Sequence, residues 1–178
     1  GESVVAVAGR IAFPDDYNTD TLFVAIDSGI GNGDVYRISG SVATELNING
    51  LSNIDVTSIA VTGNAANANL LAGTSASAQV YLSTDGGRNW TKSTKEPTGQ
   101  GKTFVAMAPD FSHRGKAYAT TSGRENAFSY TTDGGATWNQ RSLIDTKISN
   151  ILDLAPSPNY GQDNTLFMLT WGGKHSLW

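Results

Sequence analysis

Two stretches of the sequence share one pattern and lie 48 positions apart: Ser83-Thr84-Asp85-Gly86-Gly87-Arg88-Asn89-Trp90 and Thr131-Thr132-Asp133-Gly134-Gly135-Ala136-Thr137-Trp138. In each, the aspartate can accept hydrogen bonds from nearby backbone amides, and the paired glycines permit the positive φ of a tight turn. The tryptophan can fold back to cover the hairpin. The pattern therefore predicts the same structural turn twice.

The spacing of these turns is also the spacing of a repeat that runs along the whole chain. Three series of residues recur at intervals of about 48: a small residue after an apolar one, the start of a short apolar run, and the apolar start of a later strand. The first series is Ala12, Ala60, Ala106 and Ala155, the second is Leu22, Leu70, Ala117 and Leu166, and the third is Val35, Val80, Phe128 and Leu177. Three series in register indicate tandem units of one architecture.

Each unit reads as short strands separated by turn residues. In the third unit we expect strands at 103–108, 117–121, 127–131 and 139–144, because these runs are rich in β-branched and aromatic residues and end at Gly, Pro, Asn or Asp. Four strands in about 48 residues are typical of a β-propeller blade. The sequence thus predicts an all-β fold of about four four-stranded antiparallel blades, approximately 1–50, 51–98, 99–146 and an incomplete 147–178. Stacking should bury apolar residues between blades, namely Val24, Ile26, Ile59, Val61, Val105, Met107, Leu152 and Leu154.

The paired turns resemble the Asp-box, Ser/Thr-x-Asp-x-Gly-x-Thr-Trp, of the Asp-box (BNR) repeat propellers, which include sialidases, sortilin-type receptors, some endoglucanases and bacterial surface proteins. The resemblance implies that the box residues are structural: Ser83, Asp85, Gly87, Trp90, Thr131, Asp133, Gly135 and Trp138. Asn89 departs from the usual Thr, the first unit lacks the box at 36–40, and the fourth ends where its box would begin. The phrases at 14–23 and 158–167 are similar to one found in bacterial tandem-repeat surface proteins.

The composition argues against several classes of partner and of chemical site. The chain has a net charge of −4, no cysteine and no cluster of basic residues, so we expect no nucleic-acid partner, no disulfide and no thiolate metal site. No apolar run approaches the length of a membrane span. We expect no cofactor.

Candidate chemical sites are few. Asp16, Asn18 and Asp20 are spaced like the opening of a calcium loop, but Thr21 stands where the sharp-turn glycine belongs, so a repeat turn is the simpler interpretation. His113 is expected in a loop, and His175 lies near Trp171 and Trp178, where a sugar could bind. Carboxylates for glycosidase chemistry could come from a set among which the sequence does not choose: Asp27, Asp34, Asp55, Asp145 and Asp153.

These observations favour a non-enzymatic module, secreted or displayed on a bacterial cell surface, that builds a structure or binds a protein or a glycan. Recognition is expected at the rim loops 29–34, 72–79 and 123–126. The alternatives are a carbohydrate-active enzyme of sialidase-like architecture, in which no catalytic residue can be identified here, and an assembly factor for a membrane complex. The chain can be part of a longer ring, one of several chains that combine blades, or a small closed ring in which residues 3–8 complete the last blade.

Overall fold

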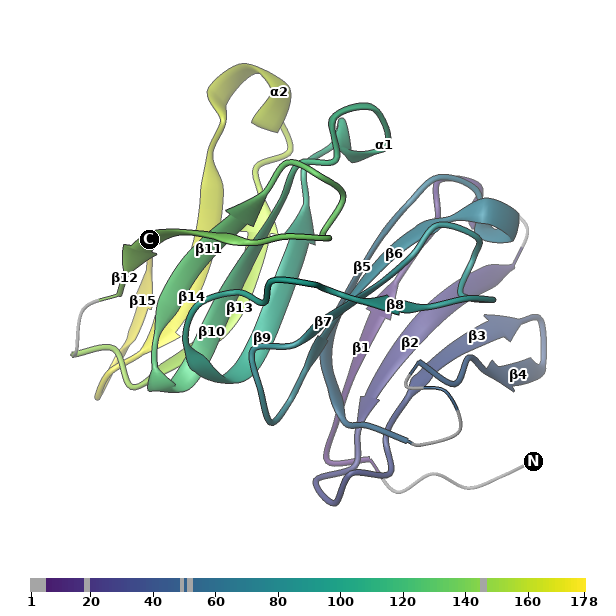
Figure 1. Cartoon of the computed structure of the whole chain (residues 1–178), viewed down its shortest axis with the longest axis horizontal. Coiled ribbons are helices and arrows are strands. Elements are labelled where there is room, and N and C mark those ends of the chain that lie inside the picture. Colours follow the sequence, from purple (N-terminus) through teal and green to yellow (C-terminus); the bar gives the residue numbers. More distant parts are fainter. Residues whose placement is uncertain (1–5, 18–19, 49, 51–52, 145–146) are drawn as a thin grey trace.

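The computed structural model describes residues 6–17, 20–48, 50, 53–144 and 147–178. It contains four antiparallel sheets, each made of strands that follow one another in sequence, and Figure 1 shows them in succession from the N-terminal blade to the C-terminal blade. The expected fold class, all-β with four propeller blades, is confirmed, although the last blade has three strands among the described residues.

The strands have the following bounds. Blade 1 comprises β1 (Ala8–Ala12), β2 (Thr21–Asp27), β3 (Val35–Ser39) and β4 (Val42–Glu45). Blade 2 comprises β5 (Val56–Thr62), β6 (Asn69–Thr74), β7 (Val80–Ser83) and β8 (Thr91–Lys92). Blade 3 comprises β9 (Gln100–Met107), β10 (Ala117–Glu125), β11 (Ala127–Thr131) and β12 (Asn139–Leu143), and blade 4 comprises β13 (Asn150–Pro156), β14 (Leu166–Trp171) and β15 (His175–Leu177).

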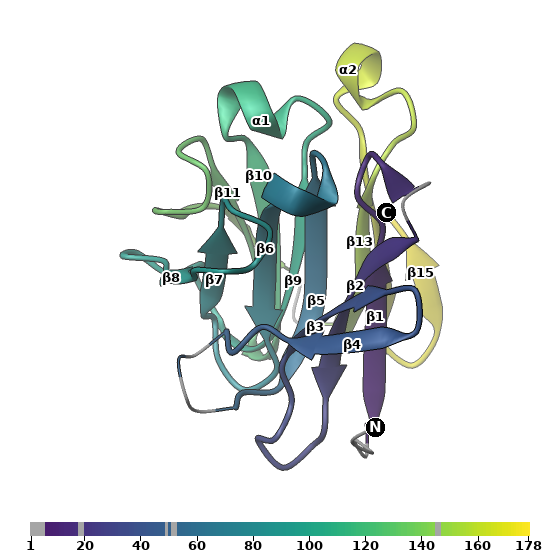
Figure 2. The same ribbon diagram turned by 90° about the vertical axis from the view of Figure 1, so that its right-hand side faces the viewer.

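One helical turn lies between the first and second strands of blades 2, 3 and 4. These turns are η2 (Ala65–Asn67), α1 (Phe111–Arg114) and α2 (Tyr160–Asp163). Both views place α1 and α2 at the same end of the sheets (Figures 1 and 2). The loops between second and third strands therefore lie at the other end. No helix of the described residues is long and apolar enough to cross a membrane.

Three apolar clusters hold neighbouring blades together. The cluster between blades 1 and 2 contains Phe23, Ala25, Val35, Leu70 and Ala72. The next joins Leu71 and Val80 to Val105, Met107 and Trp138, and the third joins Phe104 and Ala106 to Ile151 and Leu154. The sheets of blades 2 and 3 thus use one face toward the preceding blade and the other toward the following blade, as burial of both faces requires.

The three repeat series occupy equivalent places in this stack. Ala12, Ala60 and Ala106 each pack against the cluster shared with the following blade, whereas Leu70, Ala117 and Leu166 pack toward the preceding one. Val35 and Val80 are buried on the side of the following blade. Successive blades are therefore related by one packing rule.

Val24 and Ile26 were expected to be buried between two blades, and the structure does not place them there. Both are half-buried on β2, but they alternate with Phe23 and Ala25, which face blade 2, so they lie on the opposite face. That face has no described blade against it. Leu152 also departs from the expectation, because a register shift between Ile151 and Asp153 turns it toward the centre of the blades.

The two outermost faces of the stack are apolar and open. On blade 4, Phe167, Leu169 and Trp171 are 41%, 36% and 37% exposed, and Leu177 is 69% exposed. They share a face with Ala155, whose counterparts in blades 1 to 3 are packed against the next blade. On blade 1, Ile11 is 61% exposed and pairs with Val24. We call these the forward end face (Ala155, Phe167, Leu169, Trp171, Leu177) and the backward end face (Ile11, Leu22, Val24, Ile26).

Candidate functional site

The two predicted turns form the same hydrogen-bonded structure in blades 2 and 3. The amides of Gly87 and Gly135 donate to the hydroxyls of Ser83 and Thr131, at 3.0 and 3.1 Å. Glycine is needed at this point, since φ is 85° at Gly87 and 97° at Gly135.

The box aspartates organise the rest of each turn. Asp85 Oδ1 accepts from the amide of Asn89 at 3.0 Å, and Asp133 Oδ1 accepts from the amide of Thr137 at 2.9 Å. Hydrogen bonds from the amide and side chain of Asn89 lower the pKa of Asp85 to about 2. For Asp133, burial raises the pKa, but the bonds from Thr137 and Thr131 outweigh it, so the pKa lies below its usual value.

Asn89 performs the role that Thr137 has in the turn of blade 3. Its Nδ2 donates to Asp85 Oδ2 at 2.7 Å, and the hydroxyl of Thr137 donates to Asp133 Oδ2 at 2.5 Å. The amide side chain therefore reproduces the hydroxyl bond, which explains how the turn tolerates this departure from the pattern.

Of the candidate calcium ligands, Asp16 makes a structural contact with blade 2. Asp16 Oδ1 accepts from the amide of Ala65 at 2.8 Å, and Asp15 Oδ2 accepts from that of Gly63 at 2.9 Å, so this loop ties blade 1 to blade 2. Asp20 has a φ of 56°, and Asn18 lies outside the described residues. Among the described residues, no three His, Cys, Asp or Glu side chains gather as a metal site.

A central cavity of about 420 Å3 lies between the first strands of the blades. Arg10 of β1 reaches across it, with Nη2 donating to the carbonyl of Leu152 at 3.0 Å and Nη1 lying 3.7 Å from Asp153 Oδ2. Lys102 Nζ lies 3.4 Å from Asp27 Oδ2. Thr57, Ser122 and Asn150 add hydroxyl and amide groups to the lining, and the rest of it, including Phe104 and Ile151, is mainly apolar. The cavity offers both charges and several hydrogen-bonding groups to a polar ligand.

The rim beside this cavity is held by an aspartate of the neighbouring blade. Asp55 precedes β5, yet it accepts hydrogen bonds from the β2–β3 loop of blade 1: Oδ1 from the amide and hydroxyl of Ser28 and the amide of Gly33, and Oδ2 from the amide of Gly31 at 2.7 Å. Burial raises the pKa of Asp55, but these bonds outweigh it and lower the pKa below its usual value. The expected rim loop 29–34 is therefore rigidly placed.

The other candidate carboxylates that the structure describes accept hydrogen bonds from backbone amides and do not form a carboxylate pair. Asp34 is fully buried: its Oδ1 accepts from the amides of Val35 and Ile48, and its Oδ2 has no partner among the described residues. Burial raises the pKa of Asp34 to about 6. Asp27 accepts from the amide of Gly29 and Asp153 from that of Leu154, at 2.9 Å each. Asp145 lies outside the described residues.

Both histidines are exposed. His113 lies in α1, and His175 faces Trp171 across the β14–β15 ladder, with ring centroids 4.7 Å apart. Trp178 turns away from this pair, because its Nε1 donates to the hydroxyl of Thr170.

Of the residues that line the central cavity, the sequence singled out Asp27 as a candidate carboxylate but did not mark Arg10 or Lys102 as site residues. The available signal was position: nearly all of the lining residues lie on the first strand of a unit, and first strands line the axis of a propeller. Alternation alone does not tell which of these side chains point inward.

Comparison with solved structures agrees with the fold. The chain superimposes on an ancestral GH74 enzyme with a TM-score of 0.68 at 18% identity, covering 97% of this chain and 23% of that one. The structure of a nidogen/laminin complex gives a TM-score of 0.61 at 11% identity, with 94% and 63% covered. YCF48 from Cyanidioschyzon merolae gives 0.58 at 18% identity, with 94% and 54% covered. The chain thus spans about a quarter of that GH74 chain. No family model matches the sequence, and no curated protein sequence does.

Proposed function

We propose that this chain is a non-enzymatic module of the Asp-box repeat class that assembles with further blades through its two end faces. In this proposal it belongs to a secreted or surface-displayed bacterial protein, and its rim loops bind a protein or a glycan. The open apolar end faces carry the proposal, and the two box turns with one hydrogen-bonding scheme support the repeat class.

The end faces are the two halves of one kind of interface. Ala12 and Val35 of blade 1 are the equivalents of Ala155 and Leu177, and they pack in one cluster with Leu70 of blade 2, the equivalent of Leu22. Blades 2 and 3 repeat this contact with Ala60, Val80 and Ala117. A forward end face is therefore complementary in type to a backward end face, and apolar patches of this kind mark sites of association. Contact between unlike faces is head-to-tail, which closes into rings or extends into arrays.

The experiment that tests this proposal is the solution mass of the chain by light scattering over a range of concentrations. We expect the parent chain to self-associate because no other blade is present. Leu169→Lys on the forward face or Ile11→Lys on the backward face should weaken this about 10-fold or more, since each buries an unpaired charge. Ile30→Lys is the matched control, because Ile30 is 77% exposed in a rim loop.

A mixture of the two single variants tests directly whether the unlike faces bind each other. The Ile11→Lys chain keeps an intact forward face and the Leu169→Lys chain an intact backward face, so an equimolar mixture should form a heterodimer while the double variant stays monomeric. A parent chain that remains monomeric at all concentrations, or a mixture no heavier than its components, would overturn the proposal.

A further inference from the structure

The outer seam between blades 2 and 3 is closed by the chain segment that follows β8. The hydroxyl of Ser93 donates to the carbonyl of Gly135 at 2.7 Å, and the amide of Thr94 donates to the carbonyl of Ala136 at 2.8 Å. The amide of Trp138 then donates to the carbonyl of Lys95 at 3.1 Å. Residues 93–95 thus lie beside the blade 3 box as a short parallel strand, with a bridge between Lys95 and Thr137.

The equivalent seam between blades 1 and 2 is open. Leu46 corresponds to Ser93, because its amide donates to the carbonyl of Val35 as that of Ser93 donates to Val80, at 2.9 Å in both. Beyond Leu46 the chain turns away: Asn47 has a φ of 50°, and the amide of Ile48 donates to Asp34. Within the described residues, none of the backbone hydrogen bonds of the closed seam recurs between 46–48 and 88–90.

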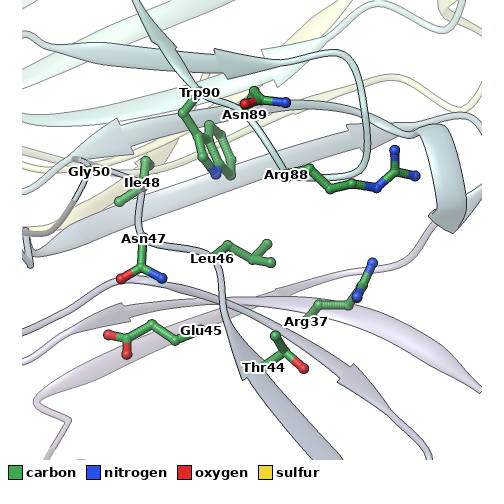
Figure 3. A pocket seen from close by; sticks show the side chains of 11 residues that line it. Arg37, Thr44, Glu45, Leu46, Asn47, Ile48, Gly50, Arg88, Asn89 and Trp90 are labelled. Atoms are coloured by element: carbon green, nitrogen blue, oxygen red, sulfur yellow. The ribbon is translucent and has the colours of Figure 1, made fainter.

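An open groove of about 520 Å3 occupies this place. Figure 3 shows Leu46 and Trp90 at its middle, with the side chains of Arg37 and Arg88 toward one end and those of Ile48 and Glu45 toward the other. One end of the groove is therefore cationic in a chain whose net charge is −4. Arg88 Nη2 also donates to the carbonyl of Ala66, which fixes its direction.

We propose that this groove binds an extended acidic peptide of a partner protein, which lies parallel to residues 88–90 as residues 93–95 lie beside 136–138. The peptide backbone would pair with the carbonyl of Arg88 and the amide of Trp90, whose counterparts Ala136 and Trp138 are bonded in the closed seam. An acidic side chain would bind Arg37 and Arg88, since charge-assisted bonds from guanidinium to carboxylate are strong and directional.

The charge arrangement selects acidic peptides and orients them. Glu45 at the opposite end accepts from the hydroxyl of Tyr36 and repels a second acid there. The proposal rests on the binding role given above but uses the outer seam of blades 1 and 2, which is separate from both end faces. It can therefore fail without any change in the association measured by light scattering.

The test uses a synthetic peptide with the sequence of residues 91–98 that carries Thr94→Asp and Lys95→Glu. The control peptide carries Thr94→Asn and Lys95→Gln instead. Binding is followed by the indole N–H resonances of the 15N-labelled chain, in which Trp90 lines the groove and Trp138 lies buried in the closed seam. We expect saturable movement of the Trp90 resonance only, and binding of the control peptide about 10-fold weaker.

Protein variants complete the test. Arg37→Gln should weaken binding of the acidic peptide about 10-fold, whereas Arg124→Gln, which changes an exposed arginine near the end of β10 in blade 3, should leave it unchanged. An unaltered Trp138 resonance verifies that each variant is folded. A Trp90 resonance that never moves, equal binding of the two peptides, or an Arg37→Gln chain that binds like the parent would each overturn the proposal.

Discussion

The indole Nε1 of Trp138 donates a hydrogen bond to the hydroxyl of Ser93 at 3.1 Å and another to the carbonyl of Gly135. Trp90 occupies the equivalent position in blade 2, but its buried Nε1 has no hydrogen-bond partner among the described residues. The loss of the first of these bonds follows from one residue, because Leu46 stands where Ser93 stands in the next seam and has no hydroxyl to accept it.

This difference predicts unequal costs for two identical substitutions. Trp138→Phe should lower the free energy of unfolding by about 1 kcal/mol more than Trp90→Phe, because only the first breaks hydrogen bonds that are made. Both substitutions remove the same part of the indole ring, from a fully buried position at Trp138 and a half-buried one at Trp90. Urea unfolding followed by far-ultraviolet circular dichroism measures the difference, and equal losses would contradict the assignment of the two indoles.

The buried carboxyl of Asp34 should make stability depend on pH in an unusual direction. Its pKa is raised from 3.8 to about 6, so between these values the folded chain holds a proton that the unfolded chain has lost. The contribution of Asp34 to the free energy of unfolding is therefore largest below about pH 4. It falls as the pH rises through 6, by up to about 3 kcal/mol.

Asp34→Asn should abolish this slope, because an amide does not titrate. The unfolding free energy of the variant minus that of the parent should rise between pH 4 and pH 7, as urea midpoints at several pH values would show. Parallel pH profiles for parent and variant would exclude the buried-acid explanation.

The box aspartates should show the opposite dependence. The pKa of Asp85 is lowered to about 2 by the bonds of Asn89, so its contribution is present above pH 4 and is lost as pH falls toward 2. Asp85→Ala should cost about 1–2 kcal/mol at pH 7 and little near pH 2. Asp110→Ala is the control, because the exposed ion pair of Asp110 with Arg114 should contribute less than 1 kcal/mol.

The substitution Asn89→Thr tests whether the two boxes are equivalent. A threonine hydroxyl can donate to Asp85 as Thr137 donates to Asp133, so we expect a change within about 0.5 kcal/mol. Asn89→Ala removes the donor and should cost about 1 kcal/mol. Thermal unfolding of the three chains separates the cases, and a threonine variant as weak as the alanine variant would show that the turns differ.

The fold could be predicted from the sequence because residues with the same structural role recur at the same place in successive units. The spacing of Ala12, Ala60 and Ala106 placed equivalent residues on equivalent faces, and the paired glycines located both box turns. The face chosen by Val24 could not be predicted, because alternation defines two faces without saying which one a neighbour covers.

The site residues were harder to predict because they depend on contacts between units. Asp55 binds the loop at Ser28 from the next blade, and Arg10 meets Leu152 at a sequence separation of 142. Nothing local in the sequence marks either contact. The open seam could have been found by aligning Leu46 with Ser93, but that alignment requires the register of the fourth strands, which β8 gives in only two residues.

The uniform packing rule has an evolutionary consequence. Since every unit presents one surface to its predecessor and another to its successor, a duplicated 48-residue segment would arrive with both contacts already suited to its neighbours. Unequal recombination could then lengthen or shorten such a protein by whole units. Selection could change the number of blades without changing the interface between any two of them.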